Sequence, residues 1–159
     1  MALTLLTANM VVQWAMSKAN PPFAPTKQGT DGVEYNLADL NAIFDKLYVA
    51  STPVAGSADF TLDLTVLEDL VNDPINFSKI LFVFVLPQGS GVNIAPGAAN
   101  GLDLFNTGAD VDIPENGALF YGGDPAGTGI VVDGTHKTLL FTNLSADALT
   151  VEIVIAGDG

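Results

Sequence analysis

The feature that most constrains this chain is an unbroken apolar run at residues 80–86, preceded by strict polar–apolar alternation at residues 59–66. Alternation with a period of two is the pattern of a β-strand that has one face in water. A short apolar run rich in Val and Phe is typical of an interior strand that is buried on both faces. We therefore predict that residues 80–86 form a central strand flanked by alternating strands.

The rest of residues 58–159 continues in the same way. Short apolar or alternating segments recur at residues 92–94, 102–104, 110–113, 118–121, 130–132, 138–142 and 149–155. Turns rich in Gly, Pro, Asn and Asp separate these segments about every 8–12 positions. About seven to nine short strands with this spacing indicate a mainly β chain, folded as an antiparallel β-sandwich or jelly-roll-like domain.

Residues 1–57 lack this pattern, and we predict that they form an irregular N-terminal arm. Three prolines within residues 21–25 disfavour regular structure there, because proline has no backbone N–H to donate. Apolar residues then recur at helical spacing from residue 37 to residue 47, behind Asn36 as an N-cap. The predicted organisation is an arm with one short helix at about residues 37–47, followed by a β-sandwich domain at residues 58–159.

The arm is also the predicted partner-binding element. It combines an apolar stretch at residues 1–14 with aromatic residues and prolines, which suits a strap that lies on another protein surface. Large aromatic side chains are the usual anchors of such contacts. The residues predicted to make them are Trp14, Pro21, Pro22, Phe23 and Pro25.

The charge of the chain excludes one broad class of function. Eighteen acidic residues oppose five lysines and no arginine, so the net charge is −13. Nucleic-acid binding depends on Lys and Arg that neutralise phosphates, so we expect no nucleic-acid partner. The same charge disfavours anionic membranes, and the longest apolar runs are too short for a membrane-spanning helix.

Residues that could support catalysis are scarce. The chain has no cysteine and one histidine, His136, which excludes thiolate chemistry and a three-histidine zinc site. Asp59 and Asp63 are a conceivable carboxylate pair, but alternation already explains them as outward-facing strand residues. We expect no catalytic residue, no cofactor and no enzymatic activity.

The densest acidic group is Asp110, Asp112 and Glu115. Calcium prefers several carboxylate and carbonyl oxygens in one place, so these residues are the weak candidates for a calcium site. The competing interpretation is the wet face of an amphipathic strand, and no Asp-x-Asp-x-Asp-Gly loop is present. The predicted metal content is therefore none.

Residues 58–159 resemble a group of small β proteins encoded among phage and prophage structural genes. The resemblance rests on the alternating strand at 60–64 with the run at 80–86, the Val-Asn-Ile start of 92–100, and a strand–Pro-x-x-Gly–strand element at 111–120. The ending, residues 139–144 followed by 151–157, is the nearest match. Similar proteins usually have two adjacent glycines where this chain has Asn116 and Gly117.

The resemblance implies a virion structural protein. We expect a decoration or cement-type protein on the outer surface of a phage capsid, bound to the major capsid protein or another virion protein. The absence of repeats and of coiled-coil heptads places a tail, fibre or baseplate module second. A carbohydrate-binding β-sandwich module is the third interpretation. We also expect a homo-oligomer, as a trimer, because threefold positions are frequent on icosahedral shells.

Overall fold

The computed structural model of the protein describes residues 14–16, 27–29, 45–68, 73–105, 108–122 and 129–159. The chain divides into two compact units, Met1–Ala42 and Ile43–Gly159. In the first unit, β1 (Trp14–Met16) pairs antiparallel with β2 (Lys27–Gly29). The predicted arm therefore contains a short β-ladder and is not irregular throughout.

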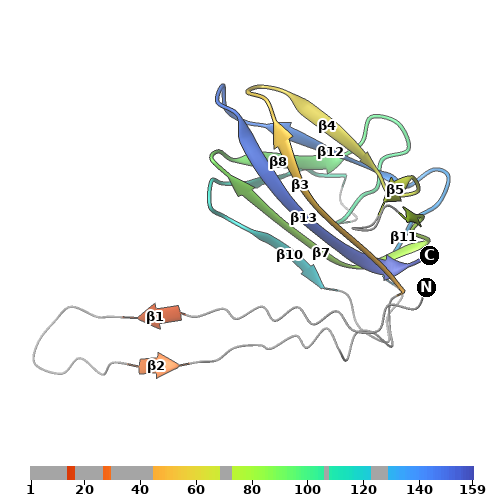
Figure 1. Ribbon diagram of the computed structural model, residues 1–159, viewed down its shortest axis with the longest axis horizontal. Helices are drawn as coiled ribbons and strands as arrows, with labels where there is room; N and C mark the ends of the chain where they lie inside the picture. Colours follow the sequence, from red (N-terminus) through yellow and green to blue (C-terminus); the bar gives the residue numbers. More distant parts are fainter. Residues whose placement is uncertain (1–13, 17–26, 30–44, 69–72, 106–107, 123–128) are drawn as a thin grey trace, which may run out of the picture. The chain divides into compact units, whose positions relative to one another are not determined.

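The second unit is built from two four-stranded antiparallel sheets (Figure 1). The first sheet has the order β10 (Leu119–Gly122), β7 (Lys79–Gln88), β13 (Leu149–Asp158), β3 (Lys46–Val54), and β11 (Ile130–Val131) also pairs with β7. The second sheet has the order β4 (Asp59–Asp63), β12 (Thr138–Asn143), β8 (Val92–Pro96), β9 (Val111–Ile113). A small ladder joins β5 (Leu67–Glu68) to β6 (Pro74–Ile75).

The strand order is that of a jelly roll. If the eight principal strands are numbered along the chain, the first sheet runs 6-3-8-1 and the second runs 2-7-4-5. Consecutive strands thus alternate between sheets as in two Greek keys, and the first and last strands lie side by side as β3 and β13. The predicted antiparallel β-sandwich of jelly-roll type is confirmed.

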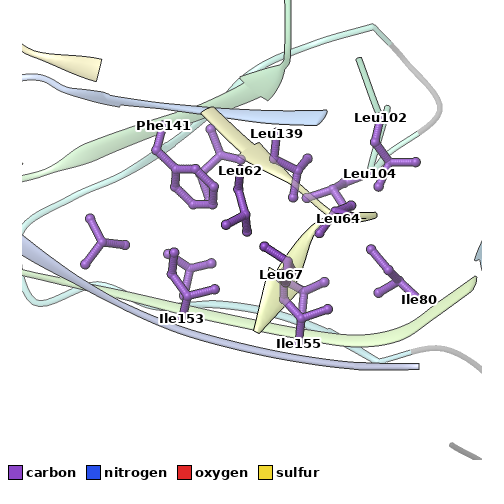
Figure 2. Close-up of a cluster of buried hydrophobic side chains, with 14 of the residues drawn as sticks. Leu62, Leu64, Leu67, Ile80, Leu102, Leu104, Leu139, Phe141, Ile153 and Ile155 are labelled. Atoms are coloured by element: carbon purple, nitrogen blue, oxygen red, sulfur yellow. The ribbon is translucent and has the colours of Figure 1, made fainter. Parts of the chain in front are cut away.

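The core lies between the two sheets, where alternate residues of each strand meet. Figure 2 shows Phe141, Leu139 and Leu62 of the second sheet pointing towards Ile153 and Ile155 of the first. Phe141 and Ile153 are 1% and 0% exposed. Phe60 stacks on Phe141 with ring centroids 4.7 Å apart, which closes the edge of this layer beside β4.

Residues 102–104 were predicted as a strand, and that prediction is wrong. They form a turn-containing segment in which Leu102 and Leu104 are buried in the core. The Asp103 carboxylate accepts backbone N–H bonds from Phe105 (3.1 Å) and from Gly108, so it satisfies the amides that a neighbouring strand would otherwise bind.

The central position of residues 80–86 is confirmed, because β7 lies between β13 and β10. Their predicted burial on both faces is wrong. Val83 and Val85 are 1% and 0% exposed, whereas Phe82, Phe84 and Leu86 are only half-buried. A two-layer sandwich has one interior, so only one face of each sheet can reach it.

The helix predicted at about residues 37–47 fails where the structure tests it. Lys46 and Leu47 begin β3, whose nine residues pair with β13 from Lys46 opposite Gly157 to Val54 opposite Leu149. Residues 37–44 lie outside the described residues. Since β3 belongs to the sandwich, the compact unit begins at Ile43 and not at residue 58. Cross-strand pairing with β13 outweighs the helical spacing here.

Candidate interaction surfaces

The outer surface of the first sheet is apolar at its centre. Alternation along each strand turns one set of residues into the core and the next set outward. The outward residues of this sheet that are apolar, half-buried or exposed, and outside the core cluster form what we call the apolar face: Leu47, Val49, Phe82, Phe84, Leu86, Phe120 and Val154.

The strand register aligns these side chains in rows across the sheet. Phe120 lies opposite Phe84, Phe84 opposite Val154, and Val154 opposite Val49. This row crosses all four strands, a width of about 14 Å at the usual strand spacing. On the next row, Phe82 contacts the Phe120 ring edge-on, with centroids 5.0 Å apart.

Charged groups stand at the two ends of the apolar face. At one end, Lys79 and Asp158 lie opposite each other and form an ion pair of 2.8 Å. At the other end, Glu152 accepts a hydrogen bond of 2.8 Å from Ser51. An apolar centre with a polar rim is the usual anatomy of a protein–protein interface.

The outer surface of the second sheet has the opposite character. Its outward residues form what we call the acidic face: Asp59, Thr61, Asp63, Asn93, Asp112 and Thr142. One row runs from Asp59 through Thr142 and Asn93 to Asp112. The sandwich therefore carries apolar and acidic surfaces on opposite sides, because its two sheets pack face to face.

Asp63 is the tethered member of the acidic face. It forms an ion pair of 2.7 Å with Lys137 and accepts hydrogen bonds from the hydroxyl and the amide of Thr65. Burial raises the pKa of the Asp63 carboxyl, but the bonds from Lys137 and Thr65 outweigh it, so the net pKa lies below its usual value. Asp59 and Asp63 are thus outward-facing strand residues, as alternation predicts.

The weak calcium candidates do not converge. The Asn93 amide nitrogen donates to Asp110 at 2.9 Å and to Asp112 at 2.7 Å, so a hydrogen-bond donor occupies the position between the two carboxylates. Glu115 lies in the turn after β9 and is exposed. Within the described part of the chain, no three His, Cys, Asp or Glu side chains gather as a metal site.

His136 is an exposed turn residue. Its Nδ1 atom lies 3.1 Å from Asp133 Oδ1. Hydrogen bonds from the backbone amide and the hydroxyl of Thr135 lower the pKa of Asp133 to about 2. The same carboxylate accepts the backbone N–H of His136 at 2.9 Å. This arrangement is that of an Asx-type turn, in which the carboxylate orders the loop.

Asn143 is a polar residue whose role the sequence did not reveal. It is 3% exposed at the end of β12. Its amide nitrogen donates to the carbonyl oxygens of Ala55 (3.0 Å) and Asp147 (2.8 Å). Its amide oxygen accepts from the Ser90 hydroxyl (3.1 Å) and the Ser145 backbone N–H (2.9 Å). Asn143 therefore joins the three loops that follow β3, β7 and β12.

A hollow of about 500 Å³ lies beside β10 and β11. Phe105 and Tyr121 line it, and both rings are half-buried and packed against the core. Asp103 is its acidic residue, but both carboxylate oxygens already accept backbone hydrogen bonds. The hollow thus lacks the convergent polar groups that orient a small ligand.

The predicted partner-binding residues fall mostly outside the described residues. Trp14 lies in β1, opposite Gly29. The others, Pro21, Pro22, Phe23 and Pro25, belong to the part of the chain that the structure does not describe. Among the described residues, no helix is long and apolar enough to cross a membrane.

Comparison with known proteins gives distant structural likenesses alone. No protein-family model matches the chain, and no curated protein matches it in sequence. The Yersinia pseudotuberculosis-derived mitogen is similar in structure over 70% of this chain and 86% of its own, with 6% identity and a TM-score of 0.34. The cupin domain of Schizosaccharomyces pombe Cnp3 is similar over 96% of this chain and 84% of its own, with 13% identity and a TM-score of 0.35. Likenesses at this level do not indicate a function.

Proposed function

We propose that the protein is a structural component of a phage virion, a decoration or cement-type protein held on the outer surface of the capsid through the major capsid protein. The observation that carries the proposal is the two-faced sandwich, with acidic groups on one sheet and apolar groups on the other. A protein that coats a particle needs one surface suited to water and another suited to burial.

The acidic face is the surface suited to water. Asp59 and Asp112 are exposed at the two edges of the second sheet. A surface that faced packaged DNA would be repelled by the phosphates, so the acidity favours an external position. The jelly roll is also an architecture that viral capsid proteins use, and the resemblance of residues 58–159 to phage structural proteins points to the same class.

We assign attachment to the N-terminal segment. A chain with five lysines, no arginine and a net charge of −13 lacks the composition for a basic docking patch. Attachment then depends on apolar burial, which contributes about 25 cal/mol per Å² and is not screened by salt. Surface ion pairs contribute less and weaken as ionic strength rises.

Trp14 and Phe23 are the aromatic anchors that this assignment tests. In pull-downs with particles that lack the protein, the wild-type chain should stay bound in molar salt. Trp14→Ala and Phe23→Ala should each weaken binding by about tenfold or more. Thr61→Ala, on the acidic face, is the matched control and should bind normally. Release by salt alone, with both aromatic variants still bound, would show that the acidic residues make the attachment.

The position in the virion requires a direct test. A cryo-electron microscopy map of the intact particle should contain the eight-stranded jelly roll on the outside of the shell, with the second sheet towards solvent. Density for the same jelly roll in the tail, fibre or baseplate would support the second interpretation instead. Particles that lack it altogether would refute a virion role.

A carbohydrate-binding role has less support. Sugars need ring faces together with polar groups that bind hydroxyls. The ring-bearing surface of the sandwich has Phe84 between Val154 and Phe120, with its polar groups at the ends of the sheet. This composition favours a protein partner.

A further inference from the structure

We infer that the apolar face is a self-association surface, and that it binds a second copy of this chain. The inference goes beyond the proposed function and does not depend on it, because it concerns the isolated protein in solution. It rests on three observations: the composition of the face, the position of its charges, and the distribution of acidity over the rest of the sandwich.

The composition is that of an interface centre. Across the four strands, the row of Phe120, Phe84, Val154 and Val49 is entirely apolar. These side chains lie outside the core cluster, so core packing does not account for them. Solvent-facing strands of a sandwich normally carry polar residues on their outward side, as the second sheet of this protein does.

The charges of the apolar face are already neutralised or hydrogen-bonded at its ends. Lys79 and Asp158 pair at 2.8 Å, and Glu152 accepts a hydrogen bond from Ser51. A flat apolar centre between these groups can be buried without leaving an unpaired charge in the interface. Burial of such a surface contributes about 25 cal/mol per Å².

The distribution of charge selects the occupant. The net charge of −13 makes copies of this chain repel one another wherever acidic groups would meet. The acidic face, with Asp59 and Asp112 exposed, is such a place. The apolar face is the broad sheet surface on which two copies can approach without bringing carboxylates together. A strongly basic partner would instead be attracted to the acidic face, so a second copy fits the apolar face better.

The test measures the mass of the full chain by sedimentation and light scattering. We expect wild-type protein to sediment at a multiple of 16.5 kDa at micromolar concentration. Phe84→Lys should raise the dissociation constant at least about 30-fold. Thr142→Lys makes the same charge change on a central strand of the acidic face and should keep the wild-type mass. Circular dichroism and thermal melts verify that each variant is folded.

A second variant protects the test against misfolding. Val49 lies in the same row on the edge strand β3, where a lysine is tolerated more easily than at the centre of the sheet. Val49→Lys should also shift the protein towards monomer. A monomeric wild-type chain would overturn the inference, and would mean that another partner or the chain's own N-terminal segment covers the face. So would Phe84→Lys and Val49→Lys variants that are folded and keep the wild-type mass. Capsid binding by a monomeric chain would leave the proposed function standing while removing this inference.

Discussion

Replacement of Asn143 by alanine should cost this protein a large part of its stability. The buried amide makes four hydrogen bonds that join three loops at one end of the jelly roll. A net value of about 1 kcal/mol for each bond gives a loss of about 4 kcal/mol. Ala55 and Asp147 lie in exposed loops, so water can reach their carbonyl oxygens in the variant and reduce the loss to about 2 kcal/mol.

The expected range for Asn143→Ala is therefore about 2–4 kcal/mol in the free energy of unfolding. For a chain of this size, that corresponds to a decrease in Tm of roughly 5–15 °C. Urea denaturation at neutral pH, followed by tryptophan fluorescence and by circular dichroism, measures the change. The decrease should appear in the midpoint, with the m-value unchanged, because the fold itself is retained.

Asn93→Ala is the control for this prediction. Asn93 also makes two amide hydrogen bonds, but both go to exposed carboxylates on the acidic face. Its replacement should cost about 0.5 kcal/mol or less. If Asn143→Ala costs no more than Asn93→Ala, the three loops do not depend on the buried amide and the reasoning is refuted.

Two further predictions concern the bulge and the ion pair. Gly157→Ala should destabilise by about 1–3 kcal/mol in denaturation experiments, because its Cβ would collide with the Lys79 carbonyl oxygen at the β13 bulge; a change under 0.5 kcal/mol, about the surface average, would contradict this. Asp63→Asn should cost about 0.5–1 kcal/mol at pH 7 by breaking the Lys137 pair. The folded-state pKa of Asp63 is lowered, so this stability is present above about pH 4 and is lost as pH falls further. The difference from wild type should therefore shrink below pH 4, whereas Asp59→Asn, the control, should show little difference at either pH.

The sequence by itself determined the class of fold. Alternation at residues 59–66 and the turn spacing of residues 58–159 identify strands with one wet face, since the side-chain period of a strand is two whatever its neighbours are. The turn at Pro114 also follows local rules: Asn116 adopts a φ of 58°, a conformation that Asn tolerates and Gly favours, so the departure from two glycines leaves the turn intact.

Only the tertiary structure decided which side of each strand becomes interior. The run at residues 80–86 is apolar on both sides, and nothing local distinguishes Phe84 from Val85. Packing of two sheets supplies one interior, so Val85 enters the core and Phe84 joins the apolar face. A clue was available: a strand that is apolar on both sides in a two-layer sandwich must present one side outward.

The pairing of β3 with β13 likewise lay beyond the sequence. Leu47 fits a helical spacing with the residues before it, and a local pattern cannot register a partner about a hundred positions away along the chain. In the fold, Leu47 lies opposite Ala156, and Gly159 donates a backbone hydrogen bond of 2.9 Å to Asp45. The network around Asn143 has the same origin, because its four partners come from loops that only the closed jelly roll brings together. Periodicity is a local property of the chain, whereas register, burial and hydrogen-bond partners are properties of the assembled sheets.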